Sequence, residues 1–540
     1  MAGTSTERIG RRGFLRLAAV TAAVAATPPA ARAQAPKRGG VLKHIGLEPS
    51  TFDIHAASDE AQLMSSFVRR TLFKFVNGAR HGPSDFTLAP DLALRAEVGG
   101  DGRVYTIALR RGVTWEARPP VNGRELVASD VKYSMERALR TSPRADLLGP
   151  VESVETPDKY TVRVHLADAF APFLHSLAEP WSAVLPPEVE GKTGDLKAIE
   201  SLIGCGPFVL ERYEPGIKAV FARNPGYYAK GLPYLDKIEW VFIRDRSTQL
   251  SLFRAGQVDI PFHDGRIPRT ELASFGTSNP GYPVVFWDGL ATRALAMRTD
   301  KAPFNDARVR RALSLGVDRR KWVAQHLGGQ GFENNGAVPA AMHEWKLATK
   351  DLGAAARYLE HNPSLARKLL ADAGFPRGLK VKCTRWPGYG PEHAEDLDLL
   401  ASDLERVGVE LSIVNEEHGT HVRGSLLGKY DETTWGPPST FTEVDGYLYG
   451  FYKTGRPGNR SHVADSRLDV LLDAQRRDTA KSSRKKVIDE IQRHVAEQAY
   501  YIYTPYPRNV SSWAPRVRNY GPKNSFDRGA QMEVVWIDRA

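Results

Sequence analysis

The spacing of apolar residues predicts a chain of alternating strands and helices. Within residues 86–140, the run VYTIALRRGVTW alternates, and Gly99-Gly100-Asp101-Gly102 separates it from an earlier apolar run, which predicts a β-hairpin. The next run, ASDVKYSMERALRTS, has apolar residues close to helical spacing, with Ser129 or Asp130 as the expected N-cap. Strands followed by an amphipathic helix are therefore expected here.

Residues 204–260 change to a pattern of strand, turn, strand, helix and strand. The expected helix, STQLSLFRAG, has Ser247 as its N-cap and Gly256 as its end. Aromatic and branched residues mark the strands around it, which read GCGPFVLERYEPG, AVFARNPGYY, KIEWVFIRD and QVDIPF.

Residues 306–417 predict more helices and a βαβ unit. Asn305 or Asp306 caps one helix, Asp318 caps a second, and Asn362-Pro363 opens a third. LKVKCTRW and VELSIVNEE then read as parallel strands with a right-handed crossover through the helix EHAEDLDLLASDLERVG.

Ligands of α/β proteins collect at the carboxyl ends of such strands. Here those ends bring in Arg385, Trp386 and the following PGYG, and the next strand, around Tyr430 to Thr434, delivers Trp435. The loop WGPPSTF holds two prolines, which cannot donate to a central ladder, so a stiff aromatic loop is expected.

Composition indicates a folded globular protein. Of the 540 residues, 42% are apolar and 25% are charged, which excludes a disordered class. The formal net charge is +11, but the basic residues are dispersed and no nucleic-acid motif accompanies them, so no nucleic-acid partner is expected. The two cysteines, Cys205 and Cys383, make neither a disulfide framework nor a metal spacing.

The amino terminus predicts an export signal over residues 1–33. It has a basic start, an apolar run of ten residues that is too short to span a bilayer, and a small-residue end. Arg11-Arg12 followed by Gly-Phe-Leu indicates the twin-arginine route; an ordinary secretory signal is the alternative. Removing residues 1–35, which hold five arginines and one glutamate, lowers the net charge of +11 by four, to +7.

No catalytic motif is found in the sequence. There is no nucleophile elbow, no Walker loop and no HExxH, so no enzyme, no cofactor and no metal are expected. His343, His393 and His421 are interpreted as surface or satisfied histidines and not as ligands. The run PEHAED is interpreted as an exposed acidic helix start, which the helix dipole favours.

Several segments together resemble the peptide/nickel/opine family (family 5) of ABC-transporter periplasmic solute-binding proteins. The resemblance covers nearly all of the mature chain. The matching stretches are PDLALRAEVGGDGRVYTIALRRGVTW, ASDVKYSMERAL, GCGPFVLERYEPG, RNPGYY, GLPYLDKIEWVFIRDRSTQLSLFRAGQVDI, DARVRRALSLGVDR, NPSLARKLLADAGF and DEIQRHVAEQAYYIY.

This resemblance implies an α/β fold of the periplasmic binding protein type, with two lobes and a hinge, in the large three-domain form. Residues 37–83, 204–282 and 508–540 would form the core domain of lobe I. Residues 84–203 would be inserted into lobe I, and residues 283–507 would form lobe II. The implied function is a monomeric periplasmic receptor that closes on a peptide or small-molecule solute and delivers it to an inner-membrane ABC permease.

The resemblance also points to a solute site. Peptide binders of the family carry W-x-x-D here, with the acid pairing the peptide amine. This chain keeps Trp435 and has Pro438 in place of the acid, which disfavours a peptide with a free amine. Each aromatic residue has core packing as its alternative, and Glu443 is a second candidate to replace the acid. The expected ligand-binding residues are Trp435, Gly436, Pro437, Ser439, Thr440, Trp386, Tyr389, Phe52, Asp53 and Asp445, with Trp181 and Trp287 as weaker candidates.

Two classes of function stay open. The first is the non-enzymatic solute receptor, whose ligand is an oligopeptide, an opine-like or sugar-like conjugate, or a metal chelate. The second is a periplasmic hydrolase or chaperone-like protein, for which the sequence offers no catalytic constellation.

Overall fold

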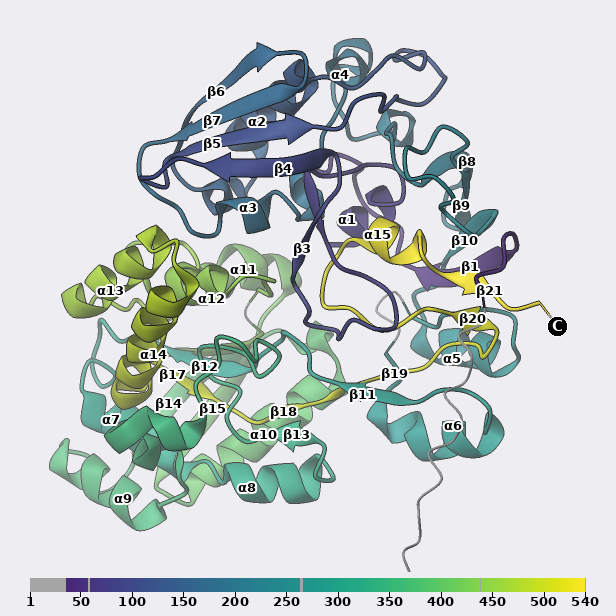
Figure 1. Cartoon of the computed structure of the whole chain (residues 1–540). Helices are drawn as coiled ribbons and strands as arrows, with labels where there is room; N and C mark the ends of the chain where they lie inside the picture. The colour runs from purple at the N-terminus through teal and green to yellow at the C-terminus, as the bar shows by residue number, and fades with distance from the viewer. Residues whose placement is uncertain (1–34, 57–58, 263–265, 438, 540) are drawn as a thin grey trace, which may run out of the picture. The chain divides into compact units, whose positions relative to one another are not determined.

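The computed structural model describes residues 35–56, 59–262, 266–437 and 439–539 (Figure 1). The expected signal segment 1–33 and Pro438 lie outside the described residues. Contacts separate Met1–Lys37 from a compact unit, Arg38–Ala540, and the fold given below is that of the second unit by itself. No helix in the described part of the chain is long and apolar enough to cross a membrane.

One four-stranded sheet joins the start of the chain to a segment about 170 residues later. Its order is β1-β10-β9-β8, and β1 pairs with β10 in parallel while the other neighbours are antiparallel. Leu42, Ile238, Trp240 and Phe221 are buried on it because apolar residues alternate along these strands. The strands are β1 (Val41–Gly46), β8 (Phe208–Glu214), β9 (Lys218–Arg223) and β10 (Lys237–Phe242).

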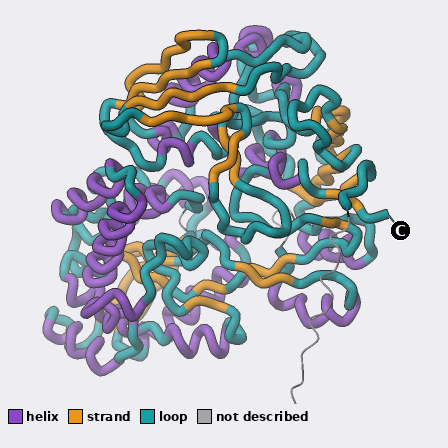
Figure 2. Tube along the Cα trace, in the orientation of Figure 1, coloured by secondary structure: helices purple, strands orange, loops and turns teal. Residues whose placement is uncertain are grey.

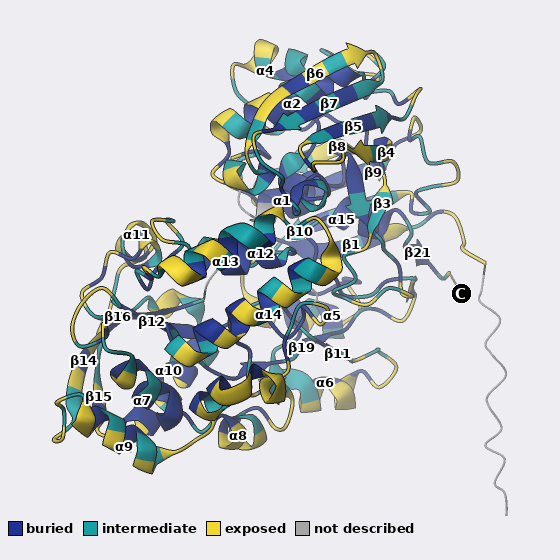
Figure 3. Ribbon diagram, turned by 60° about the vertical axis from the view of Figure 1, so that its left-hand side comes forward, coloured by how far each residue is buried: buried dark blue, intermediate teal, exposed yellow. Residues whose placement is uncertain are grey.

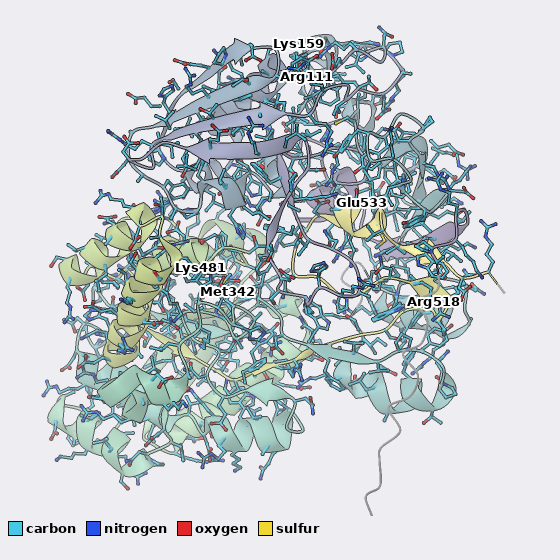
Figure 4. All side chains as sticks on the ribbon, in the orientation of Figure 1. Arg111, Lys159, Met342, Lys481, Arg518 and Glu533 are labelled. Atoms are coloured by element: carbon cyan, nitrogen blue, oxygen red, sulfur yellow. The ribbon has the colours of Figure 1, made fainter. Side chains whose placement is uncertain are left out.

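The carboxyl-terminal segment packs against this same region. Arg70 forms ion pairs with Asp91 and, at 3.1 Å, with Asp527, which caps α15 (Arg528–Met532). Glu533, labelled in Figure 4, accepts a 2.5 Å hydrogen bond from Tyr227. Nearby elements are α1 (Asp59–Ser65), α5 (Arg246–Arg254), α6 (Leu272–Ser278), β2 (Phe73–Phe75), β3 (Leu88–Pro90), β20 (Val517–Arg518) and β21 (Trp536–Ile537).

A second, antiparallel sheet of order β4-β5-β7-β6 lies at the top of Figure 2. The predicted hairpin and helix are confirmed as β4, β5 and α2, and α2 packs against β6 and β7. The N-cap is Val127 and not Ser129 or Asp130. The elements are β4 (Ala93–Val98), β5 (Val104–Leu109), α2 (Ala128–Thr141), β6 (Val151–Asp158), β7 (Thr161–Leu166), α3 (Phe173–Ser176) and α4 (Pro187–Thr193).

A five-stranded sheet of order β15-β14-β16-β12-β17 forms the centre of the other half. The predicted βαβ unit is confirmed, because β14 pairs in parallel with β15 and α10 lies between them in the chain. Leu397, Leu400 and Leu404 of α10 have no exposed surface. The elements are β12 (Ala294–Met297), β14 (Leu379–Arg385), α10 (Pro391–Glu405), β15 (Val409–Asn415), β16 (Thr433–Gly436) and β17 (Tyr501–Tyr503).

Helices surround the five-stranded sheet, and α14 buries one stripe of its surface, as Figure 3 shows. Asp306, Asp318 and Asn362 cap their helices as predicted. The helices are α7 (Ala307–Gly316), α8 (Arg319–Lys321), α9 (Pro363–Asp372), α11 (His418–Arg423), α12 (Val444–Tyr452), α13 (Ser466–Arg477) and α14 (Lys481–Gln498).

We call the two four-stranded sheets with their helices lobe I, and the five-stranded sheet with α7–α14 lobe II. The chain leaves lobe I through β11 and returns through β19, and these two strands pair with each other. The connecting strands are β11 (Val285–Trp287) and β19 (Asn509–Ser511); β13 (Gly331–Phe332) and β18 (Tyr506–Pro507) form another antiparallel pair.

Two further local predictions in lobe I are wrong. The N-cap of α5 is Asp245 and not Ser247, because the Asp245 carboxylate accepts the amide hydrogen of Thr248 at 2.8 Å. QVDIPF forms a single bridge between Ile260 and His44 and not a strand.

Candidate functional site

Trp435 ends up in the core of lobe II. On β16 it lies opposite Leu295 of β12 and Arg385 of β14, so it occupies a central strand. Its side chain is fully buried, and its indole nitrogen donates to the carbonyl of His393 at 3.1 Å. The indole therefore packs the core here, which was the alternative to the expected wall of the solute site.

Gly436 and Pro437 carry the chain out of the sheet beside other predicted residues. A Cβ on Gly436 would lie 3.5 Å from His421 Nε2 and 3.7 Å from Tyr389 Cε2. The Pro437 carbonyl accepts a 3.1 Å hydrogen bond from Arg460. These are ordinary van der Waals distances, so Gly436 marks the point where the loop passes two side chains from other elements.

Trp386 and Tyr389 belong to a group of rings that we call the aromatic–histidine cluster. It comprises Trp386, Tyr389, His393, His418 and His421. The Trp386 ring lies 4.8 Å from that of Tyr389 and 4.5 Å from that of His418, centroid to centroid. The predicted pair is therefore brought together, half-buried, at the carboxyl end of β14.

A hydrogen-bonded chain orders this cluster. The Nδ1 of His421 lies 3.0 Å from Glu416 and its Nε2 lies 3.1 Å from the Tyr389 hydroxyl. Burial lowers the pKa of His421, although Glu416 opposes that shift. A neutral His421 that donates to Glu416 accepts from Tyr389, which fixes the position of the phenol.

Cavities lie where lobe I faces the loop and helix that follow Pro437. One, of about 320 Å³, is lined by Ser439, Thr440 and Asp445 from lobe II and by Arg144 and Leu147 from lobe I. A smaller one, of about 40 Å³, adjoins it and is lined by Thr440, Asp445, His175, Glu179 and Trp181, among others. Three predicted residues and one weaker candidate, Trp181, thus surround space shared by both lobes.

The acidic residues of this wall already have cationic partners. Asp445 lies 3.1 Å from Arg476, and Glu443 lies 2.8 Å from Arg484. Burial raises the pKa of Asp445 despite Arg476; burial would also raise the pKa of Glu443, but Arg484 lowers it overall. In this conformation neither carboxylate is left open to replace the acid that position 438 lacks.

Phe52 and Asp53 lie apart from the two cavities. Asp53 pairs with both terminal nitrogens of Arg137 on α2, at 2.9 and 2.7 Å. Phe52 packs edge-on to Tyr213, 5.8 Å away, in the core of lobe I. The structure therefore gives both residues a role inside lobe I and does not bring them to the loop after β16.

Other placements complete the comparison with the predictions. His343 is exposed, 3.3 Å from Asp288, whereas His393 is buried. The interpretation of PEHAED as exposed is wrong for Asp396, which is fully buried and pairs with Arg293 and His326. Trp287 is buried and donates to Ser511 at 2.9 Å. Cys205 and Cys383 are both free and buried.

Sequence reasoning missed the residues that lobe I and the tail of lobe II contribute. Neither periodicity nor a motif marks them, because they lie far apart in the chain and meet only when the lobes face each other. They are Arg144, Leu147, Phe170, His175, Glu179, Tyr449, Arg456, Arg460 and Arg476.

The sequence profile of the bacterial extracellular solute-binding proteins, family 5, matches residues 87–459. The chain belongs to this family. As a family 5 member the protein is a solute-binding receptor, and the resemblance seen in the sequence is confirmed.

Known proteins match over most of the length of the chain. Di/tripeptide-binding protein 2 of Pseudomonas aeruginosa is 27% identical over 470 residues, which cover 82% of this chain and 85% of the relative. Heme-binding protein A of Haemophilus influenzae is 25% identical over 500 residues and covers 88% of both chains.

Solved structures share the fold. The periplasmic binding protein DppA of Helicobacter pylori, in complex with the peptide STSA, superposes with a TM-score of 0.76 at 22% identity and covers 93% of this chain and 99% of its own. The binding protein AgaA of A. tumefaciens R10, in complex with agropinic acid, gives a TM-score of 0.75 at 24% identity, with the same coverage. These likenesses support the multi-domain α/β fold of periplasmic binding proteins.

Proposed function

We propose that this family 5 protein is the extracytoplasmic receptor of an ABC importer, which captures an oligopeptide-like or related small polar solute between its lobes and delivers it to the membrane permease. The observation that carries the proposal is the cavity of about 320 Å³ lined from both lobes. A site of this kind exists only when the lobes are closed, so solute binding and closure are linked.

Contacts between the lobes support closure by a hinge. The amide of Ala171 donates to the Arg476 carbonyl at 2.7 Å, and the Arg476 guanidinium lies 4.6 Å from the centre of the Phe170 ring. Arg456 pairs with Asp146, and Arg477 pairs with Asp168. Partly exposed ion pairs contribute only about 0–1 kcal/mol each, so a bound solute can decide between the open and closed forms.

The proposed layout follows from the connections between these parts. Lobe I would consist of a core domain, 37–83 with 204–282 and 508–540, and an inserted domain, 84–203, while 283–507 would form lobe II. The receptor would act as a monomer in the periplasm after export by the twin-arginine route and removal of residues 1–33. β11 and β19, which pair where the chain passes between the lobes, are the proposed hinge.

The proposed solute is peptide-like but is not held by a free amine at position 438. Pro438 offers no carboxylate, and Asp445 and Glu443 are engaged by Arg476 and Arg484. An ammonium group buried without a carboxylate would cost several kcal/mol. N-blocked peptides and conjugates whose amine is masked therefore fit this site better than peptides with a free amino end.

Native mass spectrometry of the mature protein, isolated from the periplasm, tests the proposal. We expect one non-covalent solute per chain, released unchanged on unfolding, and rebinding of the purified solute in calorimetry. Chemical conversion of the released solute by the purified protein would contradict a receptor. A bound peptide with a free amine would leave the receptor standing and overturn the inference drawn from Pro438.

A further inference from the structure

Arg460 is a buried arginine whose guanidinium has few hydrogen-bond partners. Arg460 is 7% exposed. Its guanidinium makes one hydrogen bond, from Nη2 to the Pro437 carbonyl at 3.1 Å. Over the described ranges of the chain, no carboxylate lies within ion-pair distance of Arg460. The remaining hydrogens on Nε and Nη1 are therefore left for another acceptor.

Other buried arginines of the chain have more ion-pair or hydrogen-bond partners than Arg460. Arg70 pairs with two aspartates, and Arg137 pairs with Asp53 and Glu190. Arg319 has no ion pair, but its two terminal nitrogens donate to three backbone carbonyls at 2.9 to 3.3 Å and to a serine hydroxyl. These three side chains have structural partners, whereas Arg460 has one carbonyl.

The surroundings of Arg460 are aromatic and neutral. The titratable groups that lie near it are four tyrosines, Tyr389, Tyr430, Tyr501 and Tyr503, and His421 of the aromatic–histidine cluster. Burial lowers the pKa of Arg460, and the tyrosines oppose that shift, but a guanidinium stays charged at neutral pH. A buried cation without a counter-charge costs several kcal/mol, so its position favours an anion that arrives with the solute.

We propose that Arg460 is the anchor for a carboxylate of the solute, and that the loop after β16 selects an anionic group where peptide binders of the family select an ammonium. This assignment rests on the proposed receptor function. The bond from Nη2 to Pro437 holds the guanidinium against the loop, one residue before Pro438, which replaces the acid. Nη2 keeps a second hydrogen, so a carboxylate that faces Nη2 together with Nε or Nη1 can accept two parallel hydrogen bonds.

The test compares two N-acetylated peptides, which have no free amine and differ only in whether they carry a carboxylate. N-acetyl-Ala-Ala-Ala carries one negative charge, and its carboxyl-terminal amide carries none. Calorimetry and thermal shift are run on the full mature protein, on Arg460→Gln and on Arg319→Gln as a matched buried arginine. We expect the acid to bind the unsubstituted protein at least about tenfold more tightly than the amide, and Arg460→Gln to abolish this preference.

Stability without solute separates a binding role from a structural one. Arg460→Gln removes an unpaired buried charge, so it should melt at or above the temperature of the unsubstituted protein, whereas Arg319→Gln leaves carbonyls without donors and should melt lower. A loss of stability in Arg460→Gln as large as that in Arg319→Gln overturns the assignment.

Three binding results also overturn it: equal affinity for acid and amide, a preference that survives in Arg460→Gln, or failure of the unsubstituted protein to bind the acid. With equal affinity the receptor function stands and only the role of Arg460 fails. A different result, the chemical conversion of a co-purified solute, would contradict the receptor function itself.

Discussion

Trp435 and Gly436 are neighbours in the chain and face different environments. Trp435 points into the core between β16 and α10, where it meets the backbone of His393. Gly436, one residue later, lies beside Tyr389 and His421. Strand alternation explains the difference, because successive positions of β16 point to opposite sides of the sheet.

At this scale we expect Trp435→Ala to destabilise lobe II. Removing a fully buried indole should lower the free energy of unfolding by about 3–5 kcal/mol, since the cavity cannot refill. Denaturant titration followed by circular dichroism measures the loss. Trp386→Ala, which truncates a half-buried indole, is the matched control and should cost clearly less; equal midpoints for Trp435→Ala and the unsubstituted protein would refute core packing.

Residue identity alone could not show which aromatic residues pack the core and which lie near the candidate site. The sequence pointed to WGPPSTF and to the Trp386 and Tyr389 pair, and the structure brings Tyr389 against Gly436. It could not say which side of the strand Trp435 faces, because that depends on register, and β16 starts at Thr433 and not near Tyr430. Arg460 carried no local signal, since only its lack of partners distinguishes it.

At the scale of elements, the start of α2 shows how one side chain organises a helix terminus. Asp130 accepts the amide hydrogen of Val127 at 3.0 Å and two hydrogen bonds from Arg124 at 2.8 Å. Its Oδ2 also lies 3.3 Å from the indole nitrogen of Trp115. Asp130 therefore ties α2 to the loop that leads into it.

We expect Asp130→Ala to destabilise the antiparallel sheet and α2 by about 3 kcal/mol, because Arg124, Trp115 and the Val127 amide all lose an acceptor. Glu136→Ala, on the exposed face of the same helix, should change stability by less than about 0.5 kcal/mol. Thermal unfolding gives both values. Similar melting temperatures for the two variants would show that the Asp130 network contributes little.

Elements with strong periodicity were predicted well, and their ends were predicted less well. The hairpin β4–β5, the helix α2 and the unit β14-α10-β15 follow from local patterns that tertiary packing reinforces. The caps of α2 and α5 were misplaced because the capping acid can stand at the third helical position or two residues before an equally suitable serine. QVDIPF reads as a strand but meets only one partner.

At the scale of the whole molecule, His175 lies where the lobes meet. Its Nε2 is 2.8 Å from the hydroxyl of Thr442, and that hydroxyl also bonds Glu179. Burial lowers the pKa of His175 to about 4, with Glu443 opposing and Arg484 reinforcing that shift. His55, whose pKa burial also lowers to about 4, lies beside Arg137 inside lobe I and reports on unfolding, not on closure.

Low pH should therefore favour the open form of the protein. A histidine that opening exposes regains a pKa near 6.5, so the closed form binds fewer protons and loses stability as pH falls from about 6.5 towards 4. We expect solute affinity to fall in that range by at most about tenfold per pH unit. In calorimetry His175→Gln should flatten the profile, and an unchanged slope in this variant would assign the effect to other groups.

Two contacts of the carboxyl-terminal segment also determine the order in which the lobes become complete. They are the ion pair of Arg70 with Asp527 and the hydrogen bond from Tyr227 to Glu533. Lobe I holds the first strand of the fold, yet it gains its last partners from residues more than 450 positions later. During synthesis lobe II emerges complete while lobe I still lacks its final segment. A chain truncated before Asp527 would thus have a complete second lobe and a first lobe whose core lacks its final partners.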